Sequence, residues 1–152
     1  MKTVSIVFFS LMWFSTSIAQ NHNPKYNKTL ADSLGADAYG MKSYVLVLLK
    51  TGTNQTTDET LINKTFKGHL ENINRLANLN KLVVAGPMGA NEKNYRGIFI
   101  LNVKSLDEAR TLLETDPAIQ EKLLEAELYP WYGSAALPAY LDVHYSIEKE
   151  KP

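Results

Sequence analysis

The chain has 152 residues, which is enough for one domain with a sizeable hydrophobic core and short appendages. Its 16 basic and 16 acidic residues cancel, so no net field favours nucleic acid or an anionic membrane, and we expect neither as a partner. The chain contains no cysteine, which excludes disulfides, thiolate metal sites and cysteine nucleophiles.

The N-terminal segment has the pattern of a secretory leader. Lys2 provides a positive charge, and the apolar run VSIVFFSLMWF that follows is shorter than the roughly 20 residues of a membrane span. Ser17 and Ala19 are small residues placed as at a cleavage site after Ala19. We interpret residues 1–19 as a signal peptide, with an uncleaved anchor as the alternative, and we expect a secreted or periplasmic protein without membrane contact after cleavage.

The next segments predict a linker and the first strand. Residues 20–42 are rich in Asn, Lys, Asp and Gly, which is typical of a linker, and a short helix is expected near Lys28–Leu34. The nearly continuous apolar run SYVLVLLK at residues 43–50 predicts a strand that is buried on both faces.

A long amphipathic helix follows, capped by Thr57 or Asp58 and ending near Asn80. Its apolar side is defined by residues at helical spacing: Ile62, Phe66, Ile73 and Leu76. His69 falls on this same side of the helix. A partly buried histidine that bonds a nearby carbonyl is one interpretation of His69, and a functional site is the other.

Two strands and a second helix come next. Residues 81–88 and 95–104 are expected to pair as a hairpin across the turn GANEKN. Ser105, with Glu108 three residues later, predicts a capping box at the start of a helix. The apolar face of this helix is formed by Leu106, Ala109, Leu112 and Leu113.

A further helical turn and the last strand complete the pattern. Asp116 is a natural N-cap, and Pro117 fits the first helical position. Residues 123–133 predict a strand with clean alternation. One face carries Leu124, Ala126 and Leu128, and the other carries Glu125, Glu127, Tyr129 and Trp131.

The resulting order, β-α-β-β-α-β, predicts an α+β fold of the ferredoxin-like type, with a four-stranded antiparallel sheet and two helices on one face. The other face has no cover within the chain and carries Tyr129 and Trp131. We therefore expect a homodimer in which two sheets pair face to face. The tail, residues 134–152, is expected to pack along the domain or along a neighbouring subunit.

Four features in order resemble the YciI-like (YCII-related) family: a histidine in GHLENINRLANLNKL, a strand that ends in AGP, the Asp-Pro of DEARTLLETDPAI and a strand that ends in YPW. The resemblance covers residues 43–133. It implies a ferredoxin-like fold in the dimeric α/β barrel superfamily and an active site built on a His–Asp pair, which here corresponds to His69 and Asp116. The leader and the tail beyond Trp131 depart from the family pattern.

The side chains favour proton transfer over covalent chemistry. Imidazole changes charge near neutral pH, and a carboxylate bonded to it fixes its tautomer. There is no Gly-x-Ser-x-Gly motif, so we expect no serine nucleophile. No residue spacing supports a metal site with His69, and we expect neither a metal nor a cofactor. Arg96, at a strand start, could meet an anionic substrate, although a solvated charge is the simpler interpretation.

We therefore expect a YciI-like protein that performs cofactor-free acid–base chemistry, of lyase, isomerase or hydrolase type, on a small organic molecule. Two alternatives stay open. One is a non-catalytic domain that binds a small ligand, and the other is a structural or interaction domain that uses the aromatic sheet face and the tail.

The leader makes a direct prediction. Because the small residues place the cut after Ala19, the exported protein should begin at Gln20. Intact mass spectrometry of protein recovered outside the cytoplasm measures this, and a full-length chain retained in the cytoplasm would contradict it.

Overall fold

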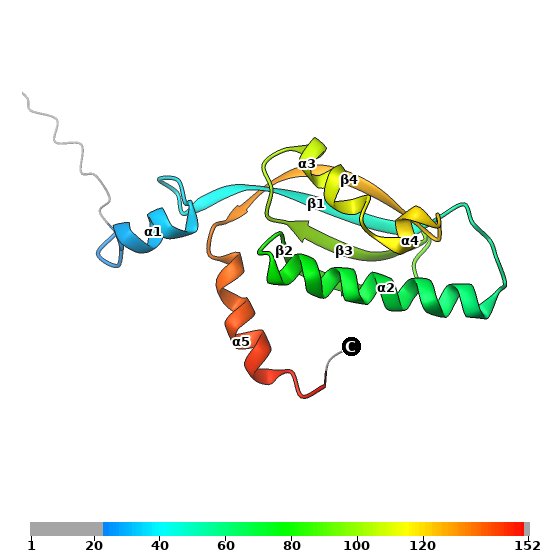
Figure 1. Ribbon diagram of the computed structural model, residues 1–152. Coiled ribbons are helices and arrows are strands. Elements are labelled where there is room, and N and C mark those ends of the chain that lie inside the picture. The colour runs from blue at the N-terminus through cyan, green and yellow to red at the C-terminus, as the bar shows by residue number, and fades with distance from the viewer. Residues whose placement is uncertain (1–22, 151–152) are drawn as a thin grey trace, which may run out of the picture.

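A four-stranded antiparallel sheet with helices packed on one face forms the body of the computed structural model, which describes residues 23–150 (Figure 1). The strand order is β2-β3-β1-β4, so the predicted α+β, ferredoxin-like arrangement is confirmed. No helix in the described part of the chain is long and apolar enough to cross a membrane. The elements are α1 (Lys28–Leu34), β1 (Met41–Thr51), α2 (Glu59–Asn78), β2 (Leu82–Pro87), β3 (Tyr95–Leu101), α3 (Leu106–Leu113), α4 (Pro117–Gln120), β4 (Leu124–Ser134), the 3-10 helix η1 (Leu137–Ala139) and α5 (Tyr140–Ile147).

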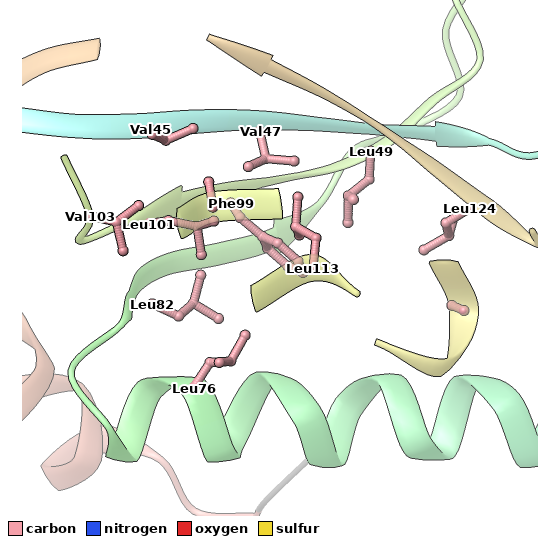
Figure 2. Packing of buried hydrophobic residues seen from close by; sticks show 12 residues of the cluster. Val45, Val47, Leu49, Leu76, Leu82, Phe99, Leu101, Val103, Leu113 and Leu124 are labelled. Carbon is pink, nitrogen blue, oxygen red and sulfur yellow. The ribbon is translucent and has the colours of Figure 1, made fainter. Parts of the chain in front are cut away.

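The core lies between the sheet and the helices α2, α3 and α4. β1 is central, and Val47 stands opposite Phe99 of β3 on one side and Leu128 of β4 on the other. Since directly opposed residues share a face of the sheet, these three side chains all point toward the helices. Figure 2 shows the cluster, which consists of Val45, Val47, Leu49, Leu76, Leu82, Phe99, Leu101, Val103, Ala109, Leu113, Ala118 and Leu124.

The prediction that the first strand is buried on both faces was wrong for the single chain. Val45, Val47 and Leu49 are buried, whereas Leu46 and Leu48 between them are only half-buried. The reason is that no helix covers the second side of the sheet. We call this side the open face, which includes Leu46, Leu48, Ile98, Ile100, Tyr129 and Trp131.

The helix caps are those that the sequence predicts, except that the Glu108 side chain does not complete its capping box. Asp58, and not Thr57, caps α2 by accepting from the backbone N–H groups of the next turn. Ser105 accepts from Glu108 N at 3.2 Å, as a capping box requires. The Glu108 carboxylate, however, accepts from Lys81 Nζ at 2.9 Å, so it is drawn toward a cation and only half of the predicted box forms.

The end segments form helices that bury none of their residues. The short helix α1 occupies the predicted positions and lies beyond the end of the sheet where β1 begins (Figure 1). In the tail, η1 and α5 follow β4, and the Tyr140 hydroxyl donates to the Val83 carbonyl. The predicted signal peptide, residues 1–19, lies outside the described residues.

Two leucines of α2 give a matched test of this core. Leu76 is 1% exposed and Leu70 is 38% exposed on the same helix. Leu76→Ala should lower the free energy of unfolding by about 2–5 kcal/mol, because it leaves a cavity under the sheet. Leu70→Ala should change that free energy by no more than about 0.5 kcal/mol. Urea unfolding measures both free energies, and equal losses would contradict the burial of Leu76 in the core.

Candidate functional site

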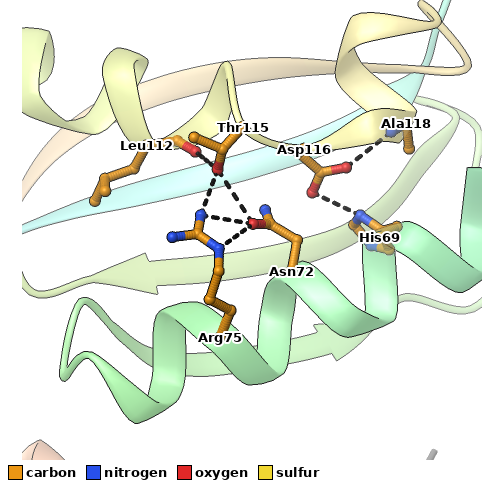
Figure 3. Close-up of polar contacts among 7 residues, drawn as sticks. All are labelled: His69, Asn72, Arg75, Leu112, Thr115, Asp116 and Ala118. Carbon is orange, nitrogen blue, oxygen red and sulfur yellow. Dashed lines mark hydrogen bonds and ion pairs between the residues drawn. The ribbon is translucent and has the colours of Figure 1, made fainter.

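His69 and Asp116 meet in the interior, between α2 and the start of α4 (Figure 3). His69 Nδ1 lies 2.7 Å from Asp116 Oδ2, so the predicted contact is confirmed. His69 is 8% exposed and Asp116 is fully buried. The two residues are 47 positions apart in sequence, and the packing of two helices on one sheet face brings them together.

Both carboxylate oxygens of Asp116 are engaged. Oδ1 accepts from the backbone N–H of Ala118 at 2.9 Å, which is the predicted N-cap of α4, and Oδ2 faces His69. Pro117 occupies the first turn, as expected. A buried carboxylate without donors would be strongly unfavourable, so the imidazole N–H is part of what allows Asp116 to be buried.

The contact fixes the proton on the His69 ring. An ionised carboxylate can only accept, so Nδ1 carries the hydrogen and Nε2 keeps a lone pair. Within residues 23–150 no buried side-chain nitrogen or oxygen lacks a hydrogen-bond partner, and none of the bonds formed there engages Nε2. Nε2 therefore retains contact with solvent and is the ring atom able to exchange a proton with a ligand.

Two aromatic rings hold the imidazole in its orientation. Phe99 of β3 stacks on it with ring centroids 5.9 Å apart and an angle of 21°. Phe66, one turn earlier on α2, meets the imidazole edge to face at 6.1 Å and 84°. With Nδ1 bonded and both aromatic contacts made, the ring has little freedom to rotate.

A glycine allows the two helices to approach this closely. A Cβ atom built on Gly68 would lie 3.0 Å from Cγ of Pro117, the residue after Asp116. Glycine inside a helix costs about 1 kcal/mol relative to alanine. Here it gives Pro117, and with it the Asp116 carboxylate, room to reach α2. Sequence reasoning missed Gly68, although an isolated glycine inside a helical pattern is a usable signal.

A second polar cluster ties α2 to the residue before Asp116 (Figure 3). Asn72 Oδ1 accepts from Arg75 Nη2 at 2.8 Å, and the same Nη2 donates to the Thr115 hydroxyl at 2.7 Å. Thr115 Oγ1 also lies 3.1 Å from Asn72 Oδ1. The cluster stands beside the His69–Asp116 pair and fixes the turn that carries the carboxylate. Sequence reasoning missed it because these three residues are ordinary surface types.

An open cleft of about 380 Å³ lies near the pair. Phe66 connects the two, because it lines the cleft and its ring also contacts the His69 imidazole. His69 itself is not among the residues that line it. The lining residues are Thr51, Asn54, Gln55, Thr56, Thr57, Ile62, Phe66, Arg96, Leu123 and Leu124. We call this space the Phe66 cleft.

The arrangement can transfer a proton. Nε2 can accept one, and the Asp116 carboxylate would then stabilise the imidazolium, as the buried acid does in a hydrolase triad. Among the described residues no group of three or more His, Cys, Asp or Glu side chains is placed to hold a metal ion.

The fold and the site define a small α+β domain with a buried His–Asp pair beside an open cleft. The chain belongs to the YCII-related domain family, because the model of that family matches residues 44–132, more than half of the sequence. The family expected from the sequence is therefore confirmed.

Among solved structures, the chain is similar to 5-chloro-2-hydroxyhydroquinone dehydrochlorinase (TftG) from Burkholderia phenoliruptrix, in complex with 2,5-dihydroxybenzoquinone. The identity is 21%, the match covers 57% of this chain and 92% of that chain, and the TM-score is 0.40. A comparison with curated proteins finds no match.

Asp116→Asn tests whether the carboxylate sets the histidine tautomer. Asparagine is an equally good N-cap, so α4 should remain. Its amide can donate to Nδ1, which would move the ring proton to Nε2. The ¹⁵N chemical shifts of His69 at neutral pH report the tautomer directly.

Asp58→Asn, at the exposed cap of α2, is the matched control and should leave the His69 spectrum unchanged. A His69 ring that keeps the same tautomer in Asp116→Asn would show that another group holds the proton on Nδ1.

Proposed function

We propose that this protein is an exported, cofactor-free acid–base enzyme of lyase, isomerase or hydrolase type that acts on a small organic molecule. His69 Nε2 takes or gives the proton, and Asp116 orients the ring and stabilises its charged form. One observation carries the proposal: the 2.7 Å contact between His69 Nδ1 and a carboxylate that is completely buried.

The nature of the partner supports catalysis over simple structural satisfaction. A histidine that only needed a hydrogen-bond partner could use a neutral backbone carbonyl. Here the partner is a fully buried charge, and a low local dielectric makes its interaction with an imidazolium stronger than it would be in water. The chain contains no cysteine, which is consistent with proton transfer without a thioester intermediate.

Binding without turnover is the second candidate function. The observation in its favour is that the Phe66 cleft is lined by Phe66 and not by His69 itself. A ligand could therefore fill the cleft and touch the aromatic wall without meeting Nε2. Loss of His69 would then leave binding intact, and no reaction would be found.

A second copy of the chain is the proposed cover for the open face. Tyr129 is 45% exposed there, and Trp131 contacts Tyr44 with the rings tilted by 42° and their centroids 5.6 Å apart. At the end of the same face, Lys50 Nζ donates to Glu127 at 3.1 Å, which raises the pKa of Lys50 and lowers that of Glu127. An apolar centre with a polar rim is the usual composition of a protein interface.

His69→Gln tests the enzyme proposal. Glutamine can still donate to Asp116, so the domain should remain folded, while proton transfer is lost. Wild-type protein incubated in D₂O with a panel of small metabolites should convert or deuterate one of them, as followed by ¹H NMR. His69→Gln should slow that reaction by roughly 10²–10⁴-fold.

The matched control is His144→Gln in α5, which should keep the wild-type rate. A folded His69→Gln protein with the full rate would refute the proposed role, and binding of a metabolite without conversion by the wild type would favour the second candidate.

Tyr129→Glu tests the dimer. The side chain is exposed in the single chain, so the fold should survive, but an unpaired charge would be buried between two sheets. Light scattering should give twice the chain mass for the wild type and a lower mass for the variant. Tyr26→Glu, exposed near α1, is the control. A wild-type monomer at micromolar concentration would rule out this assembly.

A further inference from the structure

The start of β3 contains a break in the strand pattern. Leu49 of β1 stands opposite Gly97, and Lys50 stands opposite Tyr95, so Arg96 has no opposing residue on β1. This is the signature of a β-bulge, which bends a strand and redirects a side chain. In a regular strand Arg96 would lie on the open face directly opposite Lys50, where two like charges would repel each other.

The bulge places Arg96 at the Phe66 cleft instead. Of the ten residues that line this cleft, Arg96 is the only charged one. The remainder of the lining is neutral and consists of threonine and amide side chains and of the apolar residues Ile62, Phe66, Leu123 and Leu124. No carboxylate in the lining competes for the guanidinium.

Arg96 differs in this respect from the other two arginines of the chain. Arg75 donates to Asn72 and Thr115, and Arg110 donates to Asp107 at 2.7 Å. Within residues 23–150 the Arg96 side chain forms neither an ion pair nor a hydrogen bond, and it is exposed. Its position therefore offers a planar, permanently charged fork to a ligand that enters from solvent.

Two amide side chains in the loop before α2 line the cleft, and both already donate hydrogen bonds to backbone carbonyls. Asn54 Nδ2 donates to the Glu121 carbonyl at 2.9 Å, and Gln55 Nε2 donates to the Gly52 carbonyl at 3.0 Å. These two amides are therefore occupied with holding the rim in shape, which leaves Arg96 as the main recognition group. Phe66 also lines the cleft, and its ring contacts the His69 imidazole.

We propose, resting on the function proposed above, that the substrate is a small organic monoanion: a carboxylate on an apolar or aromatic frame. Arg96 pairs with the carboxylate, because a guanidinium matches its two oxygens in a bidentate fork. The frame lies against Phe66 and Leu124, and its far end passes the edge of Phe66 toward Nε2 of His69. A single cation in the lining suits a monoanion better than a phosphate dianion, which generally needs more positive charge or a cradle of backbone N–H groups.

The test uses defined probes. Benzoate and phenylacetate are titrated into the mature protein and followed by ¹H–¹⁵N NMR, with the neutral benzamide and phenylacetamide as matched probes. The acids should bind more tightly than the amides and should shift the amide signals of Thr51, Phe66 and Gly97. Arg96→Gln should weaken the acids by roughly 10- to 100-fold, as loss of a charged hydrogen-bond pair does, and should leave the amides unchanged.

Arg110→Gln, which removes an arginine already paired with Asp107, is the control and should keep wild-type affinity for both acids. Wild-type protein that shows no preference for acids over amides at millimolar concentration, or Arg96→Gln protein that binds them as the wild type does, would overturn the inference. His69→Gln separates it from the proposed function: carboxylate binding should persist there while turnover is lost. Persistent turnover in His69→Gln would refute the catalytic role and leave the role of Arg96 standing.

Discussion

The buried Asp116 carboxylate is the constraint on which the rest of the site depends. A charge with no access to water must be matched by donors, and here one is the Ala118 N–H and the other is His69 Nδ1. Meeting both demands fixes where α4 begins, how far it stands from α2 and which ring nitrogen of His69 is free. The same carboxylate thus caps the four-residue helix α4 and orients the His69 imidazole.

Close packing and hydrogen bonds together hold the turn that carries Asp116 against α2. Gly68 removes the side chain that would hold Pro117 away from α2, and the Asn72–Arg75–Thr115 cluster pulls the adjacent turn toward the same helix. Steric room and hydrogen bonding act on neighbouring residues of one turn. Because interior packing is dense, a shift of a few tenths of an ångström at this turn would be passed directly to the 2.7 Å contact.

The sequence predicts those features that depend on local chemistry. Helical spacing placed His69 on the inward side of α2, and the Asp-Pro step identified the cap of α4, so the two halves of the pair could be found separately. The bulge at Arg96 could not be found, because register is a property of two strands and no single strand records it. The apolar run of β1 predicts burial on both faces for a related reason: its residues alone do not show which face the helices cover.

The bulge also explains why the neighbouring residues Tyr95 and Arg96 do not lie where strict alternation would place them. Tyr95 is directed to the open face, where its hydroxyl lies 3.4 Å from Glu127 Oε2, while Arg96 lines the Phe66 cleft. Gly97 then packs against β2, where a Cβ atom would lie only 2.8 Å from the Gly86 carbonyl oxygen. Strict alternation would have put Arg96 on the open face, beside Lys50. The break at this one position keeps a second cation away from Lys50 on the open face and places the Arg96 guanidinium at the cleft proposed for the ligand.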